Sequence, residues 1–379
     1  MYKFNFMFYL FKVRNFIEGF IYAVFLKRIF FLLDPEFIHD RMTRAGKMLG
    51  KTFLTRTLTK IAFSYQNKTY LEQEVLGIKF KNPIGLAAGF DKNAQLTAIL
   101  PEVGFGFEEI GSITGEECAG NPKPRLWRLK KSGSLVIYYG LMNDGAEKIS
   151  KRLKNKKFNF PIGVSVAKTN CALTADNKEG IKDYVKAFNL MKDIGDYMTI
   201  NISCPNAYGG QPFTDKVSLE SLMKEISKIE YDKPIFLKMS PDLNHKEIDD
   251  ILEVVEKYKI SGVICTNLTK DYMNPRIKDK FNFVNGGISG KVLEEKANLM
   301  ISYIFKKTKG KLIIIGCGGV FTAEDAYKKI KLGANLIQMV TGMIFQGPQT
   351  ISDINLGLVE LLKKVGYKNI SEARGKEIL

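Results

Sequence analysis

The residues best suited to chemistry follow short apolar runs. Cys204 lies in NISCPN after the run at 197–203, between Asn201 and Asn206, and Asn267 ends the run GVICTN. A thiol has an ordinary pKa of about 8.5 and can act as a general base once it loses its proton. Asparagine amides carry paired donors and acceptors, which suit a planar ligand such as a pyrimidine. We expect proton abstraction here, although an inert buried cysteine and asparagines in ordinary turns are the alternatives.

Two lysines stand at the ends of apolar runs. Lys92 follows AAGFD, and Lys238 lies inside PIFLKM. A buried ammonium group is costly unless it faces a negative charge. A reduced flavin ring, which is anionic near N1 and the C2 oxygen, would supply that charge. A lysine that extends outward to solvent is the alternative for Lys238.

Glycine-rich segments follow the last two runs and precede a predicted helix. They are GCGG (316–319), Val340-Thr341-Gly342 and GGISG (286–290). Glycine lets backbone N–H groups approach an anion closely. One such segment is a weak signal, but their joint position on adjacent strands predicts a site for a phosphorylated ligand.

Eight apolar runs must position these residues, and amphipathic helical stretches separate most of them. The runs are 83–88, 107–112, 161–166, 197–203, 234–239, 262–267, 311–316 and 335–340. This alternation predicts an α/β protein with a (β/α)8 TIM barrel, whose active site lies at the C-terminal strand ends. A doubly wound open sheet is the alternative, but no GxGxxG motif follows a strand.

The composition narrows the classes of partner. The net charge of +17 favours an anionic partner such as an acidic membrane or a phosphorylated ligand, unless it reflects only a lysine-rich composition. No nucleic-acid motif is present, so we expect no nucleic-acid partner. Only two histidines and no CxxC pair occur, which predicts neither a metal site nor a disulfide framework.

The N-terminal region differs from the rest. Residues 1–33 are apolar and aromatic but are interrupted by charges, and no uncharged run reaches the roughly 18 residues that a spanning helix needs. We expect a helix in the membrane interface; a helix packed on the protein itself is the alternative. Asp34-Pro35-Glu36 predicts a helix start, followed by short helices. We expect a helical membrane and quinone-tunnel region at 1–72 and a catalytic barrel at 73–379.

Together, these segments resemble the class 2, quinone-dependent dihydroorotate dehydrogenases. The resemblance extends from about Phe25 to near the C-terminus. It is carried by FFLLDPEFIH (30–39), KNPIGLAAGFDK (81–92), GFGFEEIGSIT (104–114), GNPKPRLWRL (120–129), NISCPN (201–206), KMSPDL (238–243), GGISGK (286–291) and IIGCGGV (314–320).

The resemblance implies an FMN-dependent enzyme that oxidises (S)-dihydroorotate to orotate in de novo pyrimidine biosynthesis. Cys204 would take the proton from C5 while C6 gives hydride to the flavin, and electrons would pass to a membrane quinone. Implied FMN contacts are Ala88, Gly89, Ser112, Ser165, Asn201, Lys238, Thr266, Gly290, Gly319, Val340 and Thr341. Implied substrate contacts are Lys92, Asn143, Asn201, Asn206 and Asn267, and implied quinone-tunnel residues are His39 and Arg128. The implied location is peripheral, on the cytoplasmic face of the inner membrane if the protein is bacterial.

Several positions depart from the family pattern. Cys204 stands where the membrane class has serine, and the polar residues usual in the family are replaced by Met142, Ser165, Leu268 and Val340. Each lost polar contact could cost about 1–3 kcal/mol if its partner is left unpaired. Two alternatives therefore stay open: an FMN oxidoreductase with another dihydropyrimidine-like substrate or a soluble acceptor, and a catalytically weak flavin-binding protein.

Overall fold

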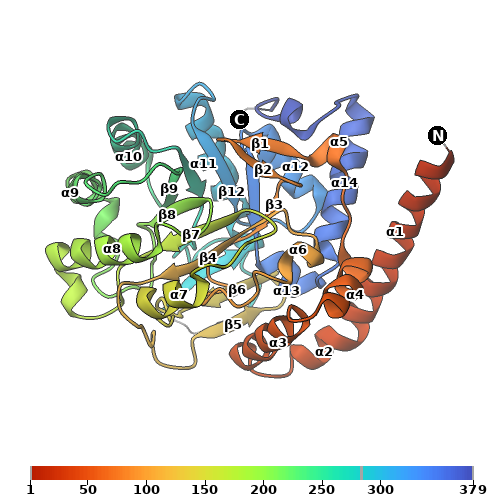
Figure 1. Ribbon diagram of the computed structural model, residues 1–379, viewed down its shortest axis with the longest axis horizontal. Helices are drawn as coiled ribbons and strands as arrows, with labels where there is room; N and C mark the ends of the chain where they lie inside the picture. The colour runs from red at the N-terminus through yellow and green to blue at the C-terminus, as the bar shows by residue number, and fades with distance from the viewer. Residues whose placement is uncertain (1, 282–284, 378–379) are drawn as a thin grey trace.

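A closed barrel of eight parallel strands forms the centre of the computed structural model, which describes residues 2–281 and 285–377. Each predicted apolar run supplies one strand, so the predicted barrel is confirmed (Figure 1). The strands are β3 (Ile84–Leu86), β4 (Phe107–Ile113), β7 (Ile162–Val166), β8 (Tyr197–Asn201), β9 (Ile235–Met239), β10 (Gly262–Cys265), β12 (Ile313–Cys317) and β13 (Leu336–Met339). Around the barrel they follow the order β10-β12-β13-β3-β4-β7-β8-β9.

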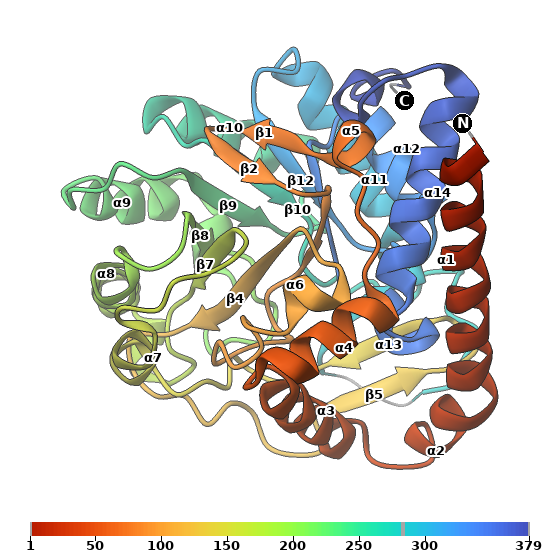
Figure 2. The same cartoon turned by 45° about the vertical axis from the view of Figure 1, so that its right-hand side comes forward.

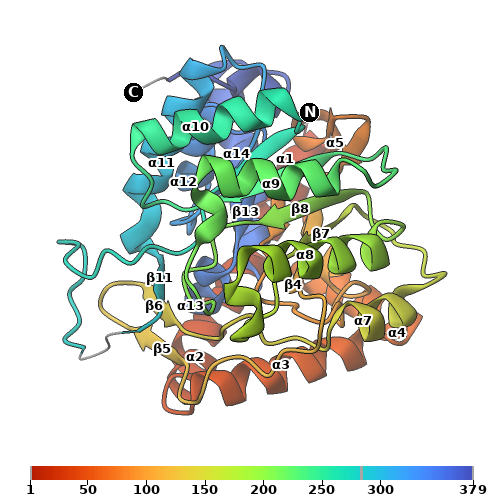
Figure 3. The same ribbon diagram turned by 90° about the vertical axis from the view of Figure 1, so that its left-hand side faces the viewer.

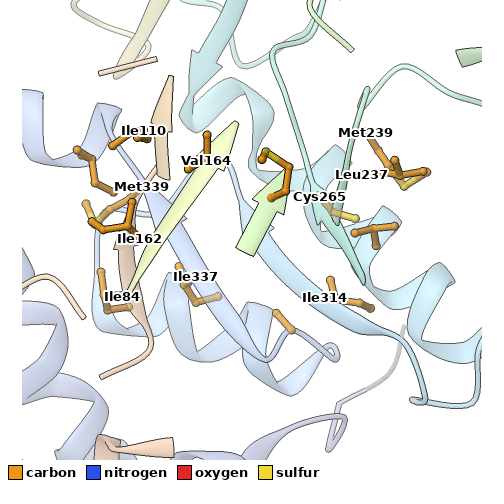
Figure 4. Packing of buried hydrophobic residues seen from close by; sticks show 14 of the residues in the cluster. Ile84, Ile110, Ile162, Val164, Leu237, Met239, Cys265, Ile314, Ile337 and Met339 are labelled. Carbon is orange, nitrogen blue, oxygen red and sulfur yellow. The ribbon is translucent and has the colours of Figure 1, made fainter. Parts of the chain in front are cut away.

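These strands are continuous apolar runs because both of their faces are buried. Figure 4 shows side chains such as Ile84, Val164 and Ile337 packed around the barrel wall. Aromatic rings fill the N-terminal part of the interior, and glycines on neighbouring strands make room for them. A Cβ added at Gly163 would lie 2.1 Å from the ring of Tyr197. Side chains therefore fill this end of the barrel and leave the other end for a cavity.

Helices surround the barrel, with α8, α9 and α10 side by side on one flank (Figure 3). Asn244 begins α10 with a capping box to Glu247, and Thr322 begins α12 in the same way with Asp325. The α-helices are α6 (Leu100–Val103), α7 (Ala146–Leu153), α8 (Asn177–Met191), α9 (Lys216–Ile226), α10 (His245–Lys257), α11 (Glu294–Lys307), α12 (Ala323–Lys331), α13 (Thr341–Gln346) and α14 (Thr350–Val365). Short 3-10 turns are η2 (Leu173–Ala175), η3 (Pro212–Thr214), η4 (Lys291–Leu293) and η5 (Ile370–Ala373).

Two small antiparallel sheets lie outside the barrel, and the sequence analysis predicted neither. One is the hairpin of β1 (Gln73–Val75) and β2 (Ile78–Phe80). The other has the order β11-β6-β5 and comprises β5 (Leu126–Leu129), β6 (Ser134–Ile137) and β11 (Gly287–Gly290). This second sheet covers the C-terminal strand ends, because residues of all three of its strands line the cavity there.

The N-terminal helices form a layer beside the barrel. A nearly continuous rod of α1 (Tyr2–Ile21), the π-helical turn η1 (Tyr22–Leu26) and α2 (Lys27–Phe30) runs along α14 (Figure 2). The short helices α3 (Pro35–Leu49), α4 (Phe53–Phe63) and α5 (Lys68–Leu71) follow. The predicted helix start is confirmed, since the Asp34 side chain accepts a hydrogen bond from Phe37 N at 2.8 Å.

Polar contacts attach one face of the rod to the barrel. Asn15 Nδ2 donates to Ser352 Oγ at 3.0 Å and to Asp353 Oδ1 at 2.8 Å, and Tyr22 donates to Ile344 O. The opposite face stays exposed and carries large apolar side chains, among them Phe6, Tyr9, Phe16, Phe20 and Phe25. The N-terminal rod therefore packs on the barrel with one face and exposes large apolar side chains on the other. No helix within residues 2–281 and 285–377 is long and apolar enough to cross a membrane.

Candidate active site

A cavity opens at the C-terminal ends of the barrel strands, beneath β5, β6 and β11. It brings together most of the residues that the sequence analysis selected, which come from seven barrel strand ends, from β11 and from α3. Those that line it are His39, Ala88, Gly89, Lys92, Ser112, Asn201, Cys204, Asn206, Lys238, Thr266, Asn267, Gly290, Gly319, Val340 and Thr341.

Three selected residues do not line the cavity. The amide of Asn143 donates to Thr114 Oγ1 at 2.7 Å and to Leu141 O at 2.8 Å, so it stabilises a neighbouring loop. Arg128 donates to Leu33 O at 2.8 Å and lies over the ring of Phe31, between β5 and the N-terminal layer. Ser165 lies behind the cavity wall, where its hydroxyl contacts the hydroxyl of Ser112.

A chain of hydrogen bonds orients the polar side chains at the strand ends. Ser165 Oγ and Ser112 Oγ are 2.8 Å apart, and Asn201 Nδ2 donates to Ser112 Oγ at 2.9 Å. Asn201 Oδ1 in turn accepts from Asn267 Nδ2 at 3.1 Å. Because each amide has defined partners, the order of donors and acceptors along this wall is defined as well. Ser165 thus supports Ser112, which lines the cavity.

Three buried polar atoms of residues on the wall have no hydrogen-bond partner in the described part of the chain. They are Lys92 Nζ, which lies 3.9 Å from the ring centre of Tyr139, the hydroxyl of Tyr139 itself, and Asn206 Oδ1. Asn206 uses its other amide atom, Nδ2, to donate to Ile137 O at 2.8 Å. Burial lowers the pKa of Lys92 to about 8. Since unpaired buried polar groups are rare, these atoms fit a ligand that both accepts and donates hydrogen bonds.

Lys238 has a buried partner that the sequence analysis missed. Its Nζ lies 3.6 Å from Glu109 Oε1, and both side chains are buried. Glu109 Oε2 also accepts from Thr199 Oγ1 at 3.0 Å and from Gln338 Nε2 at 2.9 Å. The buried carboxylate of Glu109 therefore supplies negative charge to this lysine from within the protein, and the lysine does not extend outward to solvent. The signal was present in FEEIGS, because a glutamate inside a buried strand requires a polar or cationic partner.

The glycine-rich segments meet on one side of the cavity. Gly318 and Gly319 follow β12 with φ of 112° and 76°, and Gly290 ends β11 with φ of 91°. A Cβ at Gly290 would lie 2.4 Å from Gly133 O, so a side chain does not fit there. Thr341 Oγ1, at the end of the neighbouring strand β13, lies 2.8 Å from Ser289 Oγ. Exposed backbone groups and hydroxyls at this place fit a phosphate group.

Cys204 lies in the loop after β8, and its thiol is less acidic than the sequence analysis assumed. Burial raises the pKa of Cys204 to about 11, and a hydrogen bond from the backbone of Asn206 opposes this effect. The expectation of ordinary thiol acidity is wrong because the surrounding loops desolvate the sulfur. Little of the group is a thiolate at neutral pH in this state.

The wall beneath the small sheet is apolar. Leu126, Leu135 and Ile137 come from β5 and β6, and Leu141, Met142 and Leu268 extend the same surface. Met142 packs on Arg125, which pairs with the buried Glu36 of α3 at 2.9 Å. His39 Nε2 lies 2.9 Å from Phe90 O and closes the cavity on the side of the N-terminal helices. An apolar passage beside a polar reaction site suits a hydrophobic second reactant.

A parallel eight-stranded barrel with a phosphate cradle, a buried lysine and an oriented set of amides at its strand ends is typical of flavin-dependent barrel oxidoreductases. Residues 70–362 match the family model "Dihydroorotate dehydrogenase". The chain belongs to the dihydroorotate dehydrogenase family.

Relatives similar over most of the chain carry the name dihydroorotate dehydrogenase (quinone). The one from Trichodesmium erythraeum is 38% identical over 361 residues, which cover 90% of this chain and 94% of the relative. The one from Sulfurovum sp. is 39% identical over 358 residues, which cover 93% and 97%. A crystal structure of DHODH from Eimeria tenella in complex with ferulenol superposes with a TM-score of 0.77 at 27% identity, covering 90% of this chain and 95% of that one.

Proposed function

We propose that the protein is an FMN-dependent dihydroorotate dehydrogenase that oxidises (S)-dihydroorotate to orotate and passes the electrons to a quinone, in de novo pyrimidine biosynthesis. This makes it an oxidoreductase acting on CH–CH donors. The observation that carries the proposal is the cavity, which is lined by a half-buried thiol, an unpaired lysine, three asparagines and the phosphate cradle.

The residues of the cavity fit FMN. Gly290, Gly319 and Thr341 would hold its phosphate, and Ala88, Gly89 and Val340 offer close apolar contact to the ring system. Ser112, Lys238 and Thr266 would contact its polar edge, with Ser165 supporting Ser112 from behind. When bound, FMN supplies the hydride acceptor and then the electron donor.

Around the substrate, the chain's own residues position the ring and move one proton. Lys92 would pair with the substrate carboxylate, and Asn201, Asn206 and Asn267 would bind the amide and carbonyl edges of the ring. Cys204 would take the proton from C5. Because burial disfavours its thiolate, we expect this proton transfer to speed up as the pH rises.

We further propose that residues 1–72 form a membrane and quinone-tunnel region and that residues 73–379 form the catalytic domain. The exposed apolar faces of α1, α3 and α4 support a peripheral position on a lipid bilayer, on the cytoplasmic face of the inner membrane if the protein is bacterial. A quinone would enter past His39 along the apolar wall. Arg128 lies between β5 and the N-terminal layer and would support this wall from outside the cavity.

A second candidate is an FMN oxidoreductase of the same fold that acts on another dihydropyrimidine-like substrate or uses a soluble acceptor. The apolar side chains Leu268 and Met142 in the cavity wall favour it, because they offer no hydrogen bond to a substrate. Anaerobic reduction of the bound flavin by dihydroorotate, compared with reduction by dihydrouracil, separates the two. Reduction by dihydrouracil alone would support the second candidate and contradict the first.

A further inference from the structure

Side chains from two other segments hold the loop that carries Cys204. Asn170 Oδ1, in the loop after β7, accepts from Tyr208 N at 2.6 Å. Asn121 Nδ2, ahead of β5, donates to Asn206 O at 3.1 Å. Asn170 and Asn121 are also bonded to each other at 2.9 Å. The backbone on the C-terminal side of Cys204 is therefore attached to the rest of the site.

Lys168, which is positively charged, makes a further attachment of the loop that carries Cys204. It follows β7 and is 3% exposed. Its Nζ donates to Tyr208 O at 2.7 Å and to Thr174 O at 2.9 Å, so it joins the loop after β8 to the loop after β7. Lys168 and Cys204 also line the same small cavity, together with Tyr184 and Phe213. Cys204 also lines the main cavity, but Lys168 does not, so the lysine lies on the side of the thiol that faces away from the main cavity.

The charge of Lys168 acts on the thiol without an ion-pair partner among the described residues. Cys171 and the Asp183 carboxylate of α8 also act on this charge, but Asp183 accepts its hydrogen bonds from Thr169 and Gly115. The hydrogen-bond partners of Lys168 are backbone carbonyls, and in the described part of the chain no carboxylate lies within ion-pair distance of it. The other ionisable groups that influence Cys204 are the buried Cys118 and the exposed Lys270, while Tyr184 of α8 stays neutral because burial raises its pKa. Lys168 is thus the buried cation of this group.

We propose that Lys168 is the positioning residue for Cys204: it ties down the loop that carries the thiol and places a buried positive charge beside it that stabilises the thiolate. The inference rests on the proposed role of Cys204 as the base. An opposite charge within about 4–6 Å favours an ionised group by about one to three pH units. The hydrogen bonds of Lys168 and its charge have different effects. The hydrogen bonds determine where the sulfur lies, and the charge determines how readily the thiol ionises.

Lys168→Gln separates the two roles, because glutamine can still donate to a carbonyl but carries no charge. Lys168→Arg keeps the charge, and Lys178→Gln, an exposed lysine of α8, is the matched control. The first readout is the rate of alkylation of Cys204 by iodoacetamide between pH 7 and 10, followed by peptide mass spectrometry. The second is the anaerobic rate of flavin reduction by dihydroorotate over the same pH range.

For Lys168→Gln we expect both rates to fall about tenfold at each pH below the thiol pKa, because that pKa moves up by about one unit. Lys168→Arg should restore both rates to within about twofold, and Lys178→Gln should change neither. A residue that only supports the loop would slow flavin reduction without moving the pH dependence of alkylation.

Equal alkylation rates in Lys168→Gln and the unsubstituted protein would overturn the inference. If the glutamine variant does not fold, a tenfold slower alkylation in Lys168→Arg would overturn it instead. Failure of dihydroorotate to reduce the flavin of the unsubstituted protein would contradict the proposed function, while the alkylation rates would still test the coupling between Lys168 and Cys204.

Discussion

The cavity at the strand ends and the outer face of the N-terminal helices are both largely apolar, but they differ in how their polar groups are organised. In the cavity, amides and hydroxyls form a continuous chain from Ser165 to Asn267, and only selected atoms such as Lys92 Nζ lack partners. On α1, apolar side chains such as Phe16, which is 74% exposed, face outward without any polar network. The difference is what we expect if the cavity carries the chemistry and, as proposed, the helices lie on a membrane.

Replacing the proposed base should have the largest effect. General-base catalysis contributes about 10²–10⁴-fold, so Cys204→Ala should slow anaerobic flavin reduction by dihydroorotate at least about 100-fold. Oxidation of the reduced flavin by quinone should not change, because the thiol takes no part in it. In the unsubstituted protein, reduction should speed up as pH rises toward about 11, where the thiol ionises. A Cys204→Ala variant reduced at the normal rate would contradict the role of Cys204.

Removing the buried cation in the cavity wall should have the next largest effect. Lys238→Ala leaves Glu109 buried without its cation, which typically costs about 3–5 kcal/mol in the free energy of unfolding. Denaturant unfolding and the flavin content of the purified variant measure the two consequences. Lys216→Ala, which breaks an exposed ion pair with Glu253, is the control and should cost less than about 1 kcal/mol. Full flavin retention in Lys238→Ala would show that Lys238 only balances Glu109.

Changes on the outer face of the helices should leave the cavity intact. Phe16→Asp and Phe20→Asp each remove about 1.5–3 kcal/mol of apolar burial if these rings enter a bilayer. Sedimentation with liposomes should fall about tenfold or more, while flavin reduction by dihydroorotate stays unchanged. Val217→Asp alters an equally exposed side chain on α9 and should not affect sedimentation. Unchanged sedimentation of both phenylalanine variants would remove the contrast between the two regions.

The smallest expected effect concerns the support behind the cavity wall. Ser165→Ala removes one hydrogen bond to Ser112, worth about 1 kcal/mol, and should weaken flavin binding about fivefold. Release of flavin fluorescence on dilution measures this affinity. An unchanged affinity would mean that Ser112 is positioned by Asn201 alone.

The barrel could be predicted because each strand is a short, continuous apolar run, a pattern that comes directly from burial on both faces. The site could be predicted in part because the active site of such a barrel lies at the C-terminal strand ends. Lys92, Asn201 and Asn267, which follow three strands, line one cavity there. The sheet of β5, β6 and β11 could not be predicted as a whole. Its β5 and β6 form a local hairpin, but β11 pairs with β6 across a long separation in sequence. The side-chain orientation of Asn143 and the acidity of Cys204 depend on neighbouring loops, which motifs do not describe.

The most direct test of the central claim is anaerobic mixing of the purified protein with dihydroorotate while the visible absorption band of the flavin is followed. The account predicts that this band bleaches and that adding a quinone restores it, which would demonstrate both half-reactions in one sample. A yellow protein whose band dihydroorotate does not bleach would retain the fold and the cofactor but contradict dihydroorotate as the substrate.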